Sequence, residues 1–68
     1  MTAMSIDLYK LYAGNVTTFH STFEEAKEAA KKYMPDESYL RIEVLKEIGP
    51  YEADWWAYEY ESNQWIPS

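Results

Sequence analysis

Residues 54–65 read Asp-Trp-Trp-Ala-Tyr-Glu-Tyr-Glu-Ser-Asn-Gln-Trp, and this stretch decides the fold. Successive side chains of a β-strand point to opposite faces, so a strand over Trp55–Glu61 has two different surfaces. One surface carries aromatic rings that we expect to pack against the core: Trp56, Tyr58 and Tyr60. The other is expected to face outward and carries Trp55, Ala57, Glu59 and Glu61. The reverse assignment stays open, because each surface has a tryptophan.

Three further strands are predicted from β-branched and aromatic runs at Ile6–Tyr12, Val16–His20 and Tyr39–Leu45. Ala13-Gly14-Asn15 is a turn that makes the first two strands a hairpin, since glycine and asparagine accept positive φ. In the third strand we expect Leu40, Ile42 and Val44 to point inward and Tyr39, Arg41 and Glu43 outward. A loop over Lys46–Ala53 follows, centred on Gly49-Pro50. After a turn at Ser62-Asn63, Trp65-Ile66 forms a short closing piece.

A helix is predicted to begin at Thr22, because Thr22-Phe23-Glu24-Glu25 is a capping box. In that motif the Thr22 hydroxyl accepts the Glu25 amide, and the Glu25 carboxylate reaches back. An apolar stripe follows at helical spacing: Phe23, Ala26, Ala30 and Tyr33. Glu28 and Lys32 form a favourable i,i+4 pair, and Pro35 ends the helix.

Together these elements predict a single α+β domain over residues 1–68. Its order is ββαββ, with a four-stranded, mainly antiparallel sheet and one helix packed on one face. One helix covers one face of a sheet. The other face is therefore expected to remain in water unless a partner binds it.

The composition describes a small acidic chain without cysteine: it has 68 residues, of which 47% are hydrophobic and 18% aromatic, and a net charge of −6. Disulfides and thiolate metal sites are excluded. Residues 1–35 hold four acidic and four basic side chains, whereas the rest holds eight acidic and two basic ones. Direct phosphate binding by the C-terminal half is disfavoured, and a partner with a basic surface is favoured. A merely solubilising acidic surface is the alternative.

Catalysis finds little support in the sequence, and we expect no enzyme, cofactor or metal. His20 is the only histidine, and a chain with only Gly14 and Gly49 has no glycine-rich phosphate loop. The alternative is a cluster of Glu43, Glu59 and Glu61 acting as an acid–base pair or a cation site. An exposed aromatic sheet also stacks single-stranded bases in RNA-binding proteins, but glutamates on the same strand repel a phosphate backbone.

A protein-binding face fits these residues better. The cores of protein interfaces favour tryptophan, tyrosine and arginine, and acidic side chains suit their rim. The expected contact residues, all on the outward face, are Tyr39, Arg41, Glu43, Trp55, Glu59 and Glu61.

In pattern, residues 16–66 resemble the small anti-defence proteins of bacteriophages, including anti-CRISPR inhibitors of type I surveillance complexes. The resemblance rests on the helix opening Ser21–Lys27, the strand Leu40–Glu43 and the ending from Trp56-Ala57-Tyr58 to Gln64-Trp65. The layout is also similar to that of a small phage inhibitor of bacterial RNA polymerase. The resemblance implies stoichiometric binding to a host complex, often at a basic nucleic-acid channel, with no catalytic residues.

We therefore expect a non-enzymatic protein-binding module, an inhibitor encoded by a phage or mobile element. It would occlude a basic or nucleic-acid-binding surface of a host complex such as a CRISPR effector or RNA polymerase. Without a signal-peptide pattern or a membrane-spanning apolar run, we expect it in the cytoplasm, that of the host cell if phage-encoded. The alternative is a self-associating structural domain, a homodimer whose sheet faces pair back to back.

Overall fold

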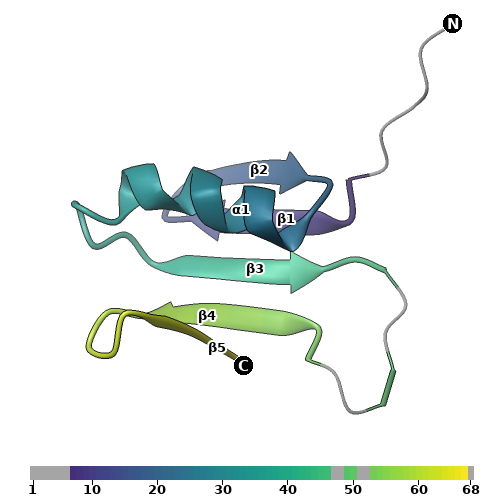
Figure 1. Ribbon diagram of the computed structural model, residues 1–68. Coiled ribbons are helices and arrows are strands. Elements are labelled where there is room, and N and C mark those ends of the chain that lie inside the picture. Colours follow the sequence, from purple (N-terminus) through teal and green to yellow (C-terminus); the bar gives the residue numbers. More distant parts are fainter. Residues whose placement is uncertain (1–6, 47–48, 51–52, 68) are drawn as a thin grey trace, which may run out of the picture.

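The computed structural model describes residues 7–46, 49–50 and 53–67. Within them the chain is α+β, with one α-helix over one face of a five-stranded antiparallel sheet (Figure 1). The elements are β1 (Tyr9–Ala13), β2 (Val16–His20), α1 (Phe23–Ala30), the 3₁₀ helix η1 (Lys31–Tyr33), β3 (Leu40–Val44), β4 (Trp55–Glu59) and β5 (Gln64–Pro67). No helix in this part of the chain is long and apolar enough to cross a membrane.

The strand order is β2-β1-β3-β4-β5, so β3 joins an N-terminal and a C-terminal hairpin. Both β2 and β3 run antiparallel to β1, which lies between them. The chain must therefore cross the sheet between β2 and β3. Helix α1 makes this crossing and lies over β1 and its neighbours (Figure 1).

The prediction of four strands is wrong at the C-terminus. The closing piece is a true strand, because β5 pairs with β4 through Ala57↔Ile66 and Tyr58↔Trp65. A turn over residues 60–63 reverses the chain, and Asn63 takes the left-handed conformation that this turn requires, with φ of 57°. Pairing with β5 also satisfies the outer backbone groups of β4, which a four-stranded sheet leaves open.

The other strand boundaries agree with the sequence to within one to three residues. β1 begins at Tyr9, and Ile6, the predicted first residue of this strand, lies outside the described residues. The β1–β2 turn uses Gly14 with φ of +58° as its first central residue, as a type II′ hairpin turn requires. Of the predicted Lys46–Ala53 loop, residues 47–48 and 51–52 lie outside the described residues.

The helix begins as predicted, because the Thr22 hydroxyl accepts the Glu25 amide at 3.0 Å. Two details differ. The Glu25 carboxylate accepts the Ser21 hydroxyl at 3.0 Å and does not reach back to the backbone. Glu28 pairs with Lys31 at 3.2 Å and not with Lys32, since residues at i,i+3 are neighbours on a helix as well as those at i,i+4.

Replacing Thr22 by alanine is expected to lower the free energy of unfolding by about 1 kcal/mol, because the Glu25 amide loses its acceptor. Chemical denaturation followed by circular dichroism measures this difference. Thr22→Ser is the matched control, since it keeps the hydroxyl. Equal losses in the two variants would show that the hydroxyl does not act as the cap.

The core lies between α1 and the sheet. Its buried residues are Leu11, Ala13, Ala26, Ala30, Leu40 and Ile42. Aromatic side chains surround them, and Phe23 contacts Trp56 at a ring-centroid distance of 5.5 Å. Tyr58 makes edge contacts with Tyr60 at 4.9 Å and with Trp65 at 5.2 Å. The predicted helix stripe and the predicted inward set Trp56, Tyr58 and Tyr60 are confirmed by this packing.

Candidate protein-binding face

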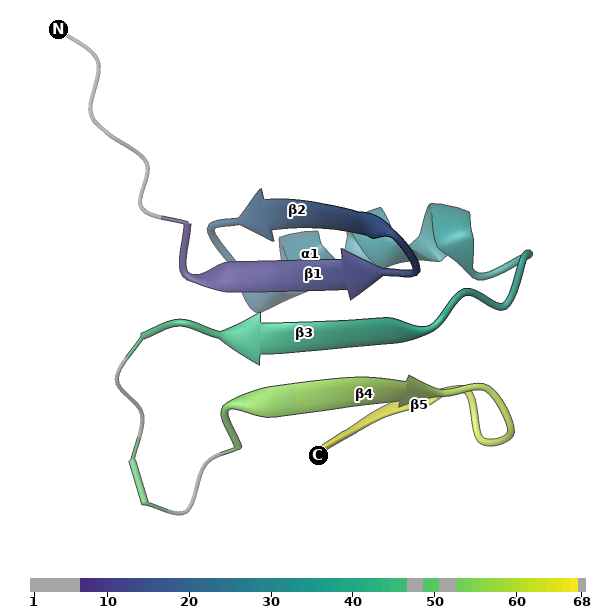
Figure 2. The ribbon, with the colours of Figure 1, turned by 180° about the vertical axis from the view of Figure 1, so that it is seen from behind.

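The face of the sheet opposite α1 is not covered by any described element (Figure 2). Strand registers define which side chains share it. One row across the sheet runs Phe19, Lys10, Glu43, Trp55, and the next runs Thr17, Tyr12, Arg41, Ala57, Ile66. This face therefore combines aromatic, cationic and anionic side chains from β1 to β4, and β5 adds Ile66.

Six of these residues form a connected group, which we call the open-face cluster: Lys10, Tyr12, Phe19, Arg41, Glu43 and Trp55. Its centre is Trp55, whose ring stacks on that of Tyr12 at 5.6 Å with an interplanar angle of 25°. The guanidinium carbon of Arg41 lies 4.3 Å from the Trp55 ring centroid. Both contacts fix the indole without burying it fully, and each contributes about 0.5–1.5 kcal/mol in comparable settings.

Lys10 extends the cluster toward the β2 edge. Its ammonium lies 5.0 Å from the Tyr12 ring and 5.5 Å from the ring of Phe19, which is 51% exposed. The hydrogen-bonding interaction with Tyr12 raises the pKa of Lys10, and the Glu43 carboxylate adds to this effect. Both effects favour the charged form of Lys10.

The carboxylate of Glu43 is held by a neighbour from β1, because the Tyr12 hydroxyl donates to it at 2.9 Å. Arg41 is less well satisfied. Its Nε is buried and has no hydrogen-bond partner among the described residues. A buried N–H group without an acceptor lowers the stability of the fold. A binding partner could supply an acceptor only if the Arg41 side chain moved to expose its Nε.

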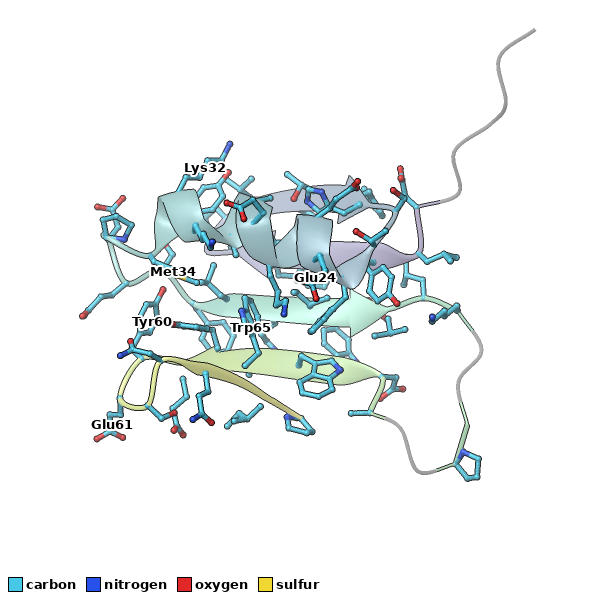
Figure 3. All side chains as sticks on the ribbon, in the orientation of Figure 1. Glu24, Lys32, Met34, Tyr60, Glu61 and Trp65 are labelled. Carbon is cyan, nitrogen blue, oxygen red and sulfur yellow. The ribbon has the colours of Figure 1, made fainter. Side chains whose placement is uncertain are left out.

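Tyr39, Glu59 and Glu61 lie at one end of the sheet, where the loop before β3 meets the β4–β5 turn. Tyr39 is 68% exposed, and continuing the β3–β4 register places it opposite Glu59. Glu59 is exposed and accepts the Ser62 hydroxyl at 2.5 Å. Glu61 was predicted to lie on the strand, but β4 ends at Glu59, so Glu61 lies in the turn, exposed beyond the sheet (Figure 3).

Four exposed carboxylates gather at this end, which we call the acidic end: Asp36, Glu37, Glu59 and Glu61. The Tyr60 hydroxyl joins its two loops by donating to the Ser38 carbonyl at 2.6 Å. Desolvation raises the pKa of Tyr60, and the Glu37 carboxylate raises it further. Negative charge from both loops is thus concentrated beside Tyr39.

The alternative acid cluster is not assembled. Glu43 lies opposite Trp55, whereas Glu59 is four residues further along β4, about 13 Å away at the spacing of a strand. Glu61 lies beyond both. Among the described residues, no group of three or more histidine, cysteine, aspartate or glutamate side chains is arranged to hold a metal ion.

Of the predicted contact residues, the structure brings Arg41, Glu43 and Trp55 together and places Tyr39, Glu59 and Glu61 at the acidic end. Lys10, Tyr12 and Phe19 were missed. The run Leu8–Tyr12 has apolar side chains at both parities, so its outward face cannot be recognised from alternation alone. The alternation in Val16–His20 does not identify Phe19 either, because a phenylalanine between polar neighbours predicts an inward side chain.

A shallow groove of about 320 Å³ lies on the other side of the molecule, between α1 and the β4–β5 hairpin (Figure 3). It is lined by Glu24, Lys27, Glu28, Lys31, Met34, Tyr58, Asn63 and Trp65. Its charged side chains already form the ion pairs Glu24–Lys27 at 3.4 Å and Glu28–Lys31 at 3.2 Å.

Comparison with known proteins returns no match: no family model, no curated protein and no solved structure is similar to this chain.

Proposed function

We propose that this protein is a non-enzymatic protein-binding module and that its open sheet face is the contact surface. The observation that carries the proposal is the half-buried open-face cluster around Trp55 on a face without a covering element in the described chain (Figure 2). Interface cores are enriched in tryptophan, tyrosine and arginine, the residue types at the centre of this cluster.

The cluster suits binding because its side chains are already ordered. Trp55 is held by Tyr12 and Arg41, and Tyr12 is held in turn by Glu43. Immobilising a free side chain costs about 0.5–1.5 kcal/mol on association, and a pre-ordered surface avoids most of this cost. The open-face cluster itself carries two cations, Lys10 and Arg41, and one anion, Glu43.

The acidic end indicates that the expected partner is positively charged. It borders Tyr39, which is 68% exposed, and the chain as a whole carries a net charge of −6. Negative charge at the rim of an interface steers a positively charged partner and raises the association rate. We infer that the partner has a basic surface. We further infer that this is a nucleic-acid-binding surface of a host complex, which this protein blocks as an inhibitor.

The charge proposal is tested with Glu59→Lys/Glu61→Lys. Because both side chains are exposed at the acidic end, the variant should fold normally but associate at least about tenfold more slowly with its partner at low salt. Binding kinetics are measured against immobilised type I CRISPR effector complex and, separately, bacterial RNA polymerase. The difference should shrink as salt rises, because surface charges are screened.

The control is Glu24→Lys/Glu28→Lys, which changes the net charge equally but on α1, at the opposite side of the sheet. Equal slowing in both variants would contradict a contact at the acidic end and point to net charge alone. If the wild-type protein binds neither complex, the proposed targets are wrong.

A further inference from the structure

The two edges of the sheet differ in how they are protected against pairing with another strand. Natural sheets block free edges with proline, charged side chains, bulges or very short strands. At one edge, β5 has four residues and ends in Pro67. At the other, β2 reads Val-Thr-Thr-Phe-His, with no proline, no lysine and no carboxylate.

The hydrogen bonds show which backbone groups of each edge have no partner among the residues that the structure describes. The Gly14 N–H donates to the Tyr39 carbonyl, and the Leu45 N–H donates to the Leu8 carbonyl. The backbone groups of even-numbered residues in β1 therefore bond to β3, and those of odd-numbered residues bond to β2. The odd residues of β1 pair with Val16, Thr18 and His20, which leaves the N–H and C=O groups of Thr17 and Phe19 pointing outward.

The same reasoning applies to β5. The Val44 N–H donates to the Asp54 carbonyl, so the backbone groups of even-numbered residues in β4 bond to β3. Those of odd-numbered residues in β4 bond to Gln64 and Ile66 of β5. The outward positions of β5 are then Trp65 and Pro67, and proline has no N–H to offer. The β5 edge therefore presents both a donor and an acceptor only at Trp65, whereas the β2 edge presents both at two positions.

We propose that the free edge of β2 is a pairing site for a second copy of this chain, with two β2 strands joined antiparallel about a two-fold axis at Thr18. The interaction goes beyond the proposed partner binding and uses the backbone edge of β2, which borders the open-face cluster at Phe19. Thr17 of each copy lies opposite Phe19 of the other, and these positions exchange the backbone hydrogen bonds. Val16 of each copy lies opposite His20 of the other.

This register suits a second copy because it is self-complementary. It places no carboxylate or ammonium group opposite another, although the chain carries a net charge of −6. It covers Val16 and Phe19, which are 41% and 51% exposed at this edge. Thr18 meets its own copy, and Thr–Thr pairs are favourable across antiparallel strands.

The paired molecule has one continuous sheet. A two-fold axis perpendicular to the sheet keeps both α1 helices on one side and both open-face clusters on the other. The two binding faces are thus presented together, which increases the avidity for a partner with repeated subunits.

A single cysteine tests the register, since the natural chain has none. Thr18 occupies a non-hydrogen-bonded pair on the axis, where Cα atoms are about 4.5 Å apart and a disulfide fits. Under mild oxidation of the purified protein alone, Thr18→Cys should form a covalent dimer at least about tenfold faster than Val16→Cys. In the same register the two Val16 positions lie about 13 Å or more apart.

The association itself is tested by sedimentation of the wild-type protein and of Thr17→Pro. Proline at position 17 removes an outward N–H and leaves the β1–β2 hydrogen bonds intact, so this variant should melt normally and stay monomeric. The wild-type dimer fraction should rise between about 50 and 500 mM salt, because screening reduces the repulsion between two acidic chains. Partner binding should show the opposite salt dependence.

Equal disulfide rates for Thr18→Cys and Val16→Cys would overturn the register. A wild-type protein that stays monomeric at all concentrations and salt levels would overturn the pairing. Neither result bears on the open-face cluster, because no partner protein is present in these experiments.

Discussion

Trp55→Ala is expected to weaken partner binding by at least about 30-fold, the loss of about 2 kcal/mol that marks an interface hot spot. The indole is the centre of the open-face cluster, where Tyr12 and Arg41 hold it in place. Its removal leaves both neighbours without their common contact and takes away the largest aromatic surface on this face. Equilibrium titration of the purified partner complex measures the change in Kd.

Trp65→Ala is the matched control, since it removes the same side chain from the groove on the helix side of the sheet. Trp65→Ala should bind within about threefold of the wild type. The reverse result, with binding lost only in Trp65→Ala, would move the binding site to the groove between α1 and the β4–β5 hairpin.

Ile42→Ala is expected to destabilise the fold by about 2–5 kcal/mol, because it opens a cavity at the centre of the core. Ile42 is fully buried on β3 and faces α1. Its cross-strand neighbours are Leu11 on β1 and Trp56 on β4. A domain of this length has a total stability of only about 3–10 kcal/mol. Urea denaturation followed by tryptophan fluorescence should therefore show a large shift of the midpoint or a protein that is already partly unfolded.

Ile42→Val removes one methylene group and should cost only about 0.5–1.5 kcal/mol. A loss below about 1 kcal/mol for Ile42→Ala would contradict the central place given to this residue in the core.

Much of the fold was predictable from local patterns. The alternation Leu40-Arg41-Ile42 identified the inward face of β3, and the Thr22 cap fixed the start of α1. The aromatic alternation at Trp56 and Tyr58 also assigned the correct face, since both pack on the core. These signals are local because each depends on the geometry of one element.

The errors have a different origin. β5 is a short strand that includes a proline, and only its pairing with β4 distinguishes it from an extended tail. The open-face cluster depends on register: Tyr12 reaches Trp55 across β3, and nothing in either segment alone indicates this contact. The candidate site was thus half predictable, with Arg41, Glu43 and Trp55 named from alternation and Lys10, Tyr12 and Phe19 found only in the folded chain.

The most direct test of the open face as the binding surface is nuclear magnetic resonance of the three tryptophan indole N–H groups during titration with the purified partner complex. Each indole reports on a different place: Trp55 on the open face, Trp56 in the aromatic layer beside α1, and Trp65 in the groove. We predict that the Trp55 signal shifts or broadens first, while that of Trp65 keeps its position. A Trp55 signal unchanged at saturation, with Trp65 perturbed, would contradict the proposal.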